Sequence, residues 1–374
     1  MTTPRRAPEV LLRRYWDDPD TPVVSAGLSA LSWAYRGALA ARDRAYRWGV
    51  LPTGRLPCPV ISVGNLTLGG TGKTPMVELV VRTLQELGAV PAVLSRGYGR
   101  TTRGVQVVAD GTGVRAEART GGDEPRLLAE RLPGVPVVVG ENRYEAGRIA
   151  VERGGVTALV LDDGFQHRTL AKDLEILVVS GRAPWGNARV FPRGTLREPL
   201  SAIGRAQAVV VTNPVAPETI AEVTAVVRRH HPTAPVLAAR YELEEASEPL
   251  RGRRVPVAEL AGRRLLAFAG LGSPEGFAHT VDATGIRRVG FVEFPDHHWF
   301  TPADVAELAR DARAAGAQGL VTTEKDWVRM REVAPPPLPI WVLPVRLVIE
   351  TRLETWRSLI AATLALAPIG GACR

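Results

Sequence analysis

The segment at residues 69–74 reads Gly-Gly-Thr-Gly-Lys-Thr and follows an apolar run, as in a phosphate-binding loop between a strand and a helix. Its glycines allow backbone N–H groups to turn toward phosphate oxygens, while Lys73 can reach the β- and γ-phosphates and Thr74 can bind Mg²⁺. Thr67 stands where the strict motif has glycine, yet a structural glycine turn would explain neither Lys73 nor Thr74. The predicted nucleotide-binding residues are Gly69, Gly70, Thr71, Gly72, Lys73 and Thr74.

A second polar cluster ends the apolar run that begins at Val156, where Asp162 and Asp163 follow one another. Carboxylates at the end of a strand beside a phosphate loop would organise Mg²⁺, so we predict Thr74, Asp162 and Asp163 as metal ligands. Gln166 and His167 come next, at the strand end where ligands bind in open α/β sheets. A plain Asp-Gly turn is the alternative, but it does not account for the accompanying phosphate loop.

Two further clusters carry titratable side chains. Asp123 and Glu124 precede a helical segment, so taken alone they are most simply explained as groups that cap the helix and match its dipole. His297 and His298 follow an apolar run, and adjacent side chains of an extended chain point in opposite directions. That spacing argues against a metal site made of both histidines and predicts one functional and one structural histidine.

Lysine is rare in this chain, because only Lys73, Lys172 and Lys325 occur among 47 basic residues. Lysine is a compact point charge and arginine a planar fork, so the two are not equivalent at a phosphate. Lys73 and Lys325 both lie in polar motifs after apolar runs, and we expect Lys325 to reach a phosphate as well. Lys172 lies between two predicted strands and is expected to be a surface charge.

These residues need a scaffold, and short apolar runs alternate with helical segments from Pro59 onward. This alternation predicts a parallel sheet with helices on both faces. A second, smaller α/β lobe is predicted from a later series of apolar runs. The first series lies at 59–63, 91–95, 135–139, 156–163, 174–179 and 208–212, with helices at 74–87 and 142–153, and the second at 264–270, 288–294, 319–325 and 339–345, with a last helix at 350–366.

The N-terminal region has 15 uncharged residues at 21–35, followed by several arginines. This stretch is too short to span a membrane, and a cleavable signal would carry its charges before the apolar part. The aromatic residues Trp33, Tyr35, Tyr46 and Trp48 favour a helix lying in the headgroup layer of a membrane. A helix packed on the protein's own core is the alternative.

The predicted organisation has five parts in chain order. They are a polar leader at 1–20, an interfacial helix region at 21–55, a nucleotide-binding domain at 56–240, a connection at 241–262 and a C-terminal α/β domain at 263–374.

Composition limits the partners and the compartment. A chain of 374 residues with 45% apolar and 23% charged residues is suited to a folded protein of two domains. Cys58 and Cys373 alone cannot form a disulfide framework or a cysteine metal site, which fits a reducing cytoplasm. The net charge of +8 and a pI of about 10.0 predict an anionic partner. Because no basic run and no basic-aromatic motif occurs, phosphate or a membrane surface is favoured over nucleic acid.

The chain resembles the tetraacyldisaccharide 4'-kinase family in a series of motifs that follow the family's order from about residue 23 to 345. Several of these motifs, notably GGDEP, DDGFQHR and DHH, are not general features of phosphate-binding loops. The segment at 191–200 departs from the family at Arg193 and Thr195, and the leader has no counterpart. The motifs are PVISVGNLTLGGTGKTP, LSRGYGR, GGDEPRLLA, GENR, VLDDGFQHR, LREPL, FPDHHWF and VTTEKDW.

The resemblance implies two α/β lobes with the active site in the cleft and an N-terminal helix docked on the cytoplasmic face of the inner membrane. It implies Mg²⁺ and ATP as cofactors, the 4'-hydroxyl of a tetraacylated glucosamine disaccharide 1-phosphate as acceptor, and no obligate protein partner. Asp123 would be the base for that hydroxyl, supported by His297, and Lys73 would act on the transferred phosphate. Other possible substrate-binding or supporting residues are Glu124, Arg143, Gln166, His167, His298 and Lys325.

Two other functions are compatible with the phosphate loop. One is a soluble kinase of a small sugar or nucleoside, in which the N-terminal helix would only pack. The other is a nucleotide-dependent switch, although Lys325 is directly followed by Asp326 and therefore lacks the spacing of a guanine-reading loop.

Overall fold

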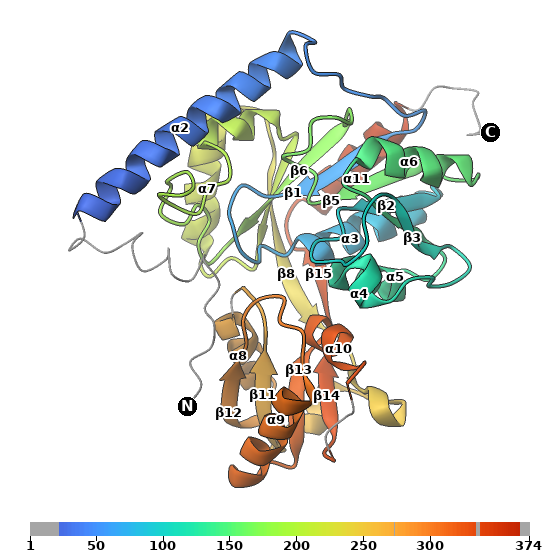
Figure 1. The fold of residues 1–374 in the computed structure, drawn as a ribbon, viewed down its shortest axis with the longest axis vertical. Helices are drawn as coiled ribbons and strands as arrows, with labels where there is room; N and C mark the ends of the chain where they lie inside the picture. The colour runs from blue at the N-terminus through green and yellow to red at the C-terminus, as the bar shows by residue number, and fades with distance from the viewer. Residues whose placement is uncertain (1–21, 273, 334–336, 367–374) are drawn as a thin grey trace.

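The computed structural model describes residues 22–272, 274–333 and 337–366, so the predicted leader at 1–20 and Cys373 lie outside the described residues. The chain forms two α/β lobes, with a large sheet in the upper lobe and a smaller sheet in the lower lobe of Figure 1. The mixed α/β class with parallel sheets, predicted from the alternation of apolar runs, is confirmed.

The sheet of the first lobe has nine strands in the order β15-β8-β7-β6-β1-β5-β2-β4-β3. The seven strands from β8 to β4 run parallel, while β15 and β3 are antiparallel edge strands. All six strands predicted for this lobe are present. The bounds are β1 Val60–Gly64, β2 Pro91–Ser95, β3 Gln106–Asp110, β4 Pro136–Val139, β5 Ala158–Asp162, β6 Leu174–Ser180, β7 Ala208–Thr212, β8 Val236–Leu243 and β15 Val345–Ile349.

Helices cover both faces of this sheet because successive strand residues point to opposite sides. In β1, Ile61 belongs to the same core as Met76, whereas the preceding Val60 belongs to the core that contains Ala146 on the other face. The helices on the first face are α3 Lys73–Glu86, α5 Asp123–Arg131 and α11 Leu353–Leu364, and those on the second are α6 Arg143–Glu152 and α7 Pro217–His230. Short helices occur at α4 Ala118–Gly121 and η1 Leu200–Arg205.

The second lobe contains a six-stranded sheet in the order β10-β9-β14-β13-β11-β12. The segment at 241–262, expected to be only a connection, supplies two of these strands and therefore belongs largely to this lobe. The elements are β9 Ala246–Glu248, η2 Pro249–Arg251, β10 Arg253–Val255, η3 Val257–Leu260, β11 Arg264–Ala269, α8 Pro274–Ala283, β12 Arg287–Glu293, α9 Pro302–Ala314, β13 Gly319–Thr323, α10 Glu324–Met330 and β14 Ile340–Leu343.

The end of the chain corrects the C-terminal domain expected at 263–374. The apolar run at 339–345, predicted as one strand, is divided at Pro344, where β14 ends in the second sheet and β15 begins in the first. β15 pairs with the otherwise open edge of β8, and α11 then packs on α3. The second lobe is thus an insertion, and the chain crosses between the lobes twice, along β8 and β15.

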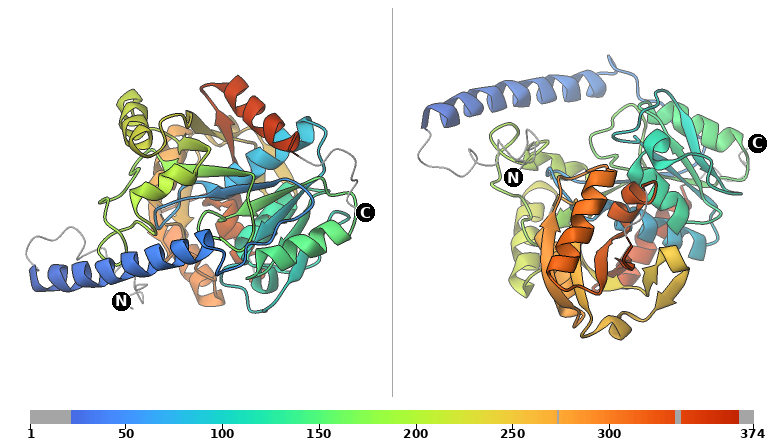
Figure 2. Two further views of the ribbon diagram at one scale, coloured as in Figure 1. Left: turned by 90° about the horizontal axis from the view of Figure 1, so that it is seen from above. Right: turned by 60° about the horizontal axis from the view of Figure 1, so that its bottom comes forward.

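Helix α2, Pro22–Arg47, lies along the outside of the first lobe, and one end extends beyond the body of the protein (Figures 1 and 2). Its inner side is held by Ser32 Oγ, which donates to the Val190 carbonyl at 2.8 Å, and by Tyr35 Oη, which donates to the Arg197 carbonyl at 3.1 Å. Leu31 and Trp33 remain about two-thirds exposed. Among the described helices, none is long and apolar enough to cross a membrane.

The return of the chain to the first lobe can be tested at Trp356 of α11. Its side chain is fully buried, and Nε1 donates to Thr83 Oγ1 of α3 at 3.0 Å. Trp356→Ala should lower the free energy of unfolding by about 3–5 kcal/mol, measured by urea denaturation, because it leaves a cavity between the helices. Trp33→Ala, at an exposed site, should change it by less than about 0.5 kcal/mol. A similarly small loss at Trp356 would contradict a stabilising role for α11.

Candidate active site

The phosphate loop connects the end of β1 to the start of α3, and its last two residues, Lys73 and Thr74, belong to the first turn of α3. Gly72 adopts φ +87° directly before the helix, and a Cβ there would collide with the hydroxyl of Tyr241. Only glycine therefore fits this position. Asn65 braces the loop, because its Nδ2 donates to the Thr67 carbonyl at 2.7 Å and to Thr71 Oγ1 at 3.0 Å. The backbone N–H groups that begin α3 form a site suited to an anion.

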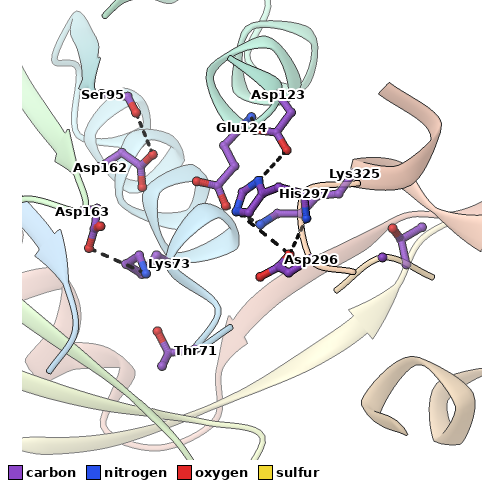
Figure 3. A network of polar contacts seen from close by, with 12 residues as sticks. Thr71, Lys73, Ser95, Asp123, Glu124, Asp162, Asp163, Asp296, His297 and Lys325 are labelled. Atoms are coloured by element: carbon purple, nitrogen blue, oxygen red, sulfur yellow. Dashed lines mark hydrogen bonds and ion pairs between the residues drawn. The ribbon is translucent and has the colours of Figure 1, made fainter. Parts of the chain in front are cut away.

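Lys73 opens α3, and its ammonium group lies among polar groups at the end of the sheet. Its Nζ lies 3.4 Å from Asn65 Oδ1 and 3.7 Å from Asp163 Oδ1. The side chain is 12% exposed. The structure thus brings the predicted Lys73 and Asp163 together beside the phosphate loop (Figure 3).

The two carboxylates at the end of β5 have different surroundings. Asp162 is buried and accepts from Ser95 Oγ at 3.0 Å, while its Oδ1 has no hydrogen-bond partner. Asp163, with φ +52°, accepts from Arg197 at 2.9 and 3.0 Å. Burial, with the charges of Glu124 and Asp163, raises the pKa of Asp162 to about 7. An unpartnered buried carboxylate oxygen is therefore directed into the site.

This arrangement fits a magnesium ion held partly by nucleotide phosphates. Mg²⁺ is commonly bound by one or two protein carboxylates together with phosphate oxygens and water. Asp162 Oδ1 offers such a ligand, and Thr74 is buried in the first turn of α3 as the phosphate-loop pattern requires. Within the part of the chain that the structure describes, no cluster of three or more His, Cys, Asp or Glu side chains forms an all-protein metal site.

Asp123 and His297 meet across the two lobes (Figure 3). His297 Nδ1 donates to Asp123 Oδ2 at 2.9 Å, although the residues are 174 positions apart. Asp123 is the first residue of α5, the N-cap is Gly122, and Asp123 Oδ1 accepts from the Glu124 N–H at 2.9 Å. Asp123 Oδ1 therefore accepts a hydrogen bond from the N–H group at the start of α5, while Oδ2 faces the second lobe.

The two groups shift each other's pKa in opposite directions. Burial alone would raise the pKa of Asp123, but the hydrogen bond from His297 and the charges of His297, Arg329 and Lys325 lower it to about 2. The same hydrogen bond raises the pKa of His297. The charged pair therefore contributes stability between about pH 4 and 6.5, the unfolded values of the two groups. Its aspartate part is lost as the pH falls toward 2, and its histidine part as the pH rises through the raised pKa.

The remaining groups at this junction are also paired across the lobes. Lys325, expected at the end of a strand, lies in the first turn of α10 and forms a short ion pair with Glu124. Arg329 is fully buried, with Nε 3.7 Å from Asp123 Oδ2 and Nη2 donating to Asp326 Oδ1 at 3.0 Å. Helix α10 thus presents two cations to the two carboxylates that begin α5.

Gln166, His167 and Arg143 lie near the end of β5 but apart from the Asp123–His297 pair. Gln166 Nε2 donates to the Asn65 carbonyl at 3.0 Å and so supports the phosphate loop. Burial and the charge of Arg143 hold the pKa of His167 at about 4, so this imidazole is neutral near pH 7. Arg143 is buried, with Nε unpartnered, which makes it available for an anion.

His298 and Lys172 serve the fold. His298 Nε2 donates to Asp304 Oδ2 at 3.0 Å, and the ring stacks on Phe294 within the second lobe. The two histidines therefore face different surroundings. The backbone between them is not the extended chain that the sequence suggested, because His297 lies in a turn with φ +58°. Lys172 was expected at the surface, but its side chain is only 5% exposed and pairs with Glu175. The expectation was wrong because a lone loop lysine gives no sign of a buried partner on the following strand.

Several groups at the site were not identified from the sequence. Asn65 and Ser95 could have been noticed, because both are polar residues that directly follow or end apolar strands. Arg197 lies in the LREPL motif of the family resemblance, although its role could not be read from it, and Arg329 carried no usable signal in a chain so rich in arginine. Both pair with site carboxylates only through contacts between residues far apart in the sequence.

Comparison with known proteins gives consistent results. The family model described as tetraacyldisaccharide-1-P 4'-kinase matches residues 24–364. The tetraacyldisaccharide 4'-kinase of Syntrophus aciditrophicus is 40% identical over 348 residues, covering 90% of this chain and 93% of that protein. That of Anaeromyxobacter dehalogenans is 44% identical over 308 residues, or 79% of each chain. A crystal structure of LpxK from Aquifex aeolicus in complex with ATP superposes with a TM-score of 0.72 at 32% identity, covering 91% of this chain and 99% of that one.

The Asp123–His297 contact can be tested by titrating the histidine side chains with NMR. Asp123→Asn should shift the titration midpoint of His297 to lower pH, because burial then acts without the compensating carboxylate. Asp304→Asn, which removes the partner of His298, should leave the His297 midpoint in place. An unchanged midpoint in Asp123→Asn would mean that the two side chains are not in contact in solution.

Proposed function

The chain belongs to the tetraacyldisaccharide-1-P 4'-kinase family, and we propose from this premise how its residues carry out the reaction. The protein is an ATP-dependent kinase that phosphorylates the 4'-hydroxyl of a tetraacylated glucosamine disaccharide 1-phosphate. The observation that carries the residue assignment is the junction of the two lobes. There a phosphate loop from one lobe lies near a carboxylate that receives a hydrogen bond from the other lobe.

Lys73 and the N–H groups that begin α3 would bind the β- and γ-phosphates of ATP, and Thr74, Asp162 and Asp163 would hold the metal. Mg²⁺, when bound, neutralises phosphate charge. Asp163 is engaged by Arg197, so Asp162, with an unpartnered oxygen, has the stronger support as a direct ligand. Lys325, which pairs with Glu124 in this structure, would move to a phosphate of ATP or of the acceptor.

Asp123 would accept the proton of the 4'-hydroxyl while that oxygen bonds to the γ-phosphorus and the bond from phosphorus to the ADP oxygen breaks. A carboxylate with a pKa of about 2 is a weak base, but phosphoryl transfer through a loose transition state requires mainly positioning and a late proton acceptor. His297 is a positioning residue in this scheme. Its hydrogen bond to Asp123 Oδ2 would hold the carboxylate in one orientation for the hydroxyl.

The outer side of α2 supports docking on an anionic membrane surface, on the cytoplasmic face of the inner membrane. Leu31, Trp33, Trp48 and Val50 are exposed, and the helix ends in a turn that contains Arg44 and Arg47. Aromatic and arginine side chains of this kind favour the headgroup layer, and each arginine contributes about 1 kcal/mol near an anionic surface. An acylated acceptor lies in a membrane, so this position would bring the enzyme to its substrate. Neither nucleic acid nor an obligate protein partner is part of the proposal.

The catalytic assignment is tested with radiolabelled ATP, Mg²⁺ and a detergent-dispersed acylated disaccharide 1-phosphate, by counting label in the lipid. Asp123→Asn should lower kcat by about 10²- to 10⁴-fold with little change in ATP affinity, because shape is kept and the proton acceptor is lost. Adding His297→Ala should cost scarcely more, since His297 acts through Asp123. Asp282→Asn, on the surface of α8, should remain near wild type. Strictly multiplicative losses in the double variant would refute the pairing.

Membrane docking is tested by cosedimentation with vesicles containing anionic lipid. Glutamate at both Leu31 and Trp33 should weaken binding at least about 10-fold, because two exposed apolar side chains that would enter the membrane are replaced by charges that repel its surface. Binding of the wild type should also weaken as salt rises. Val215→Glu, at an exposed apolar site in the segment between β7 and α7, is the control. Equal binding of all three proteins would restrict α2 to a packing role.

A further inference from the structure

A single arginine at the far end of α5 joins five segments at the point where the chain crosses between the lobes. Arg131 is the last residue of α5, and its side chain is 11% exposed. Its guanidinium forms a bidentate pair with Glu78 of α3, with Nε–Oε2 and Nη2–Oε1 distances of 2.7 and 2.9 Å. The same group reaches Glu244, which follows β8, at 2.6 Å and Glu324 of α10 at 3.1 Å.

These contacts surround the two connections between the lobes. The Glu244 N–H donates to the Pro344 carbonyl at 3.0 Å, which ties the outgoing connection to the returning one. Arg131 Nη2 also lies 3.4 Å from the carbonyl of Val345, the first residue of β15. One guanidinium therefore contacts the end of one connection and the start of the other.

The three glutamates around Arg131 require an arginine at this position. Three carboxylates, from Glu78, Glu244 and Glu324, converge on it, and burial together with Glu78 and Glu244 raises the pKa of Glu324 despite the arginine. Without the guanidinium these carboxylates would repel one another across the junction of the lobes. Lysine could not replace it, because a point charge cannot form a bidentate pair with Glu78 and still reach the other two.

Arg131 is also connected to the candidate active site through the two helices that it joins. Helix α5 has nine residues and carries Asp123 and Glu124 at its start. Helix α10 carries Glu324 beside Lys325, which pairs with Glu124, and Arg329, which faces Asp123. The α5–α10 pair is thus fixed at one end by the site contacts and at the other by Arg131, about 12 Å away along α5 at 1.5 Å per residue.

We infer that Arg131 is a positioning residue for phosphoryl transfer, which holds the second lobe in register with the first so that His297 and Lys325 reach Asp123 and Glu124. This inference rests on the kinase function proposed above. It differs from the roles proposed for Lys73 and Asp123, since Arg131 touches neither the phosphate loop nor the Asp123–His297 pair.

The kinetic test compares Arg131→Met with Arg82→Met. Arg82 pairs with the same Glu78 at 2.8 Å but is 51% exposed and forms no ion pair with the described residues of the second lobe. Arg131→Met should lower kcat at least about 10-fold with ATP affinity changed by less than about threefold, because the phosphate loop stays intact while the lobes lose their register. The kcat of Arg131→Lys should lie between that of Arg131→Met and that of the wild type. The kcat of Arg82→Met should remain within about twofold of the wild type.

A second variant keeps the test decisive if Arg131→Met fails to fold. Glu324→Gln removes one interlobe partner but leaves Arg131 and Glu78 paired, and should lower kcat severalfold at unchanged ATP affinity. The double variant Arg131→Met/Glu324→Gln should have a higher kcat than Arg131→Met alone, because one of the three carboxylates that lost the guanidinium no longer carries a charge. Wild-type kcat in both single variants, or equal losses of kcat and ATP affinity, would overturn the inference.

A measurement independent of activity separates this inference from the proposed function. Spin labels at Glu218→Cys in α7 and Glu307→Cys in α9, in a Cys373→Ser background, report the distance between the lobes by pulsed electron paramagnetic resonance. Both sites are exposed, and Cys58 is buried. Arg131→Met should broaden the distance distribution, and Arg82→Met should not. An unchanged distance distribution in Arg131→Met would refute the positioning role of Arg131, even if the kinase activity is established. A broadened distribution would support that role, even if the proposed substrate proves wrong.

Discussion

The structure depends on a buried carboxylate, Asp123, whose charge is compensated largely from the other lobe. Asp123 is 4% exposed, and a charge in such surroundings is strongly unfavourable without close partners. His297, Arg329 and Lys325 supply the compensating charge, and all three belong to the second lobe. The two lobes therefore cannot separate at this point without leaving an unpaired charge, which makes the interlobe contact a requirement of the site.

A second constraint arises from the negative charge around the phosphate loop. Asp162, Asp163 and Glu124 lie close enough for their charges to act on one another. Burial, and after it the charges of Glu124 and Asp163, raise the pKa of Asp162. Lys73 and Arg197 offset part of it on the Asp163 side. No ion pair joins Asp162 to a cation among the described residues, and the charge of Lys73 lowers its pKa only in part. A Mg²⁺ ion bound with ATP would therefore offset a carboxylate that the protein leaves largely uncompensated.

Helix α2 is connected to the nucleotide site through the segment at 190–200. Ser32, Tyr35 and Arg42 of α2 contact Val190, Arg197 and Glu198 of this segment. The segment in turn pairs with the residues before the phosphate loop, since the Leu68 N–H donates to the Thr195 carbonyl and the Arg197 N–H to the Leu66 carbonyl. The position of α2 on the first lobe is thus fixed by the backbone that borders the nucleotide site.

The sequence by itself determined the parts of this protein that follow from local pattern. The alternation of apolar runs predicted six of the nine strands of the first sheet, but not β3, β8 or β15. The glycines with Lys73 and Thr74 predicted the phosphate loop. Both predictions rest on backbone conformation and strand burial, which are set largely by neighbouring residues. It could not show that Pro344 returns the chain to the first sheet, since an apolar run does not specify its partner strand. Nor could it show that Lys325 pairs with Glu124, that Lys172 is buried, or that Arg131 and Arg329 join the lobes. Those outcomes depend on charges brought together from distant positions, and only the tertiary structure decides which of 47 basic residues meets which carboxylate.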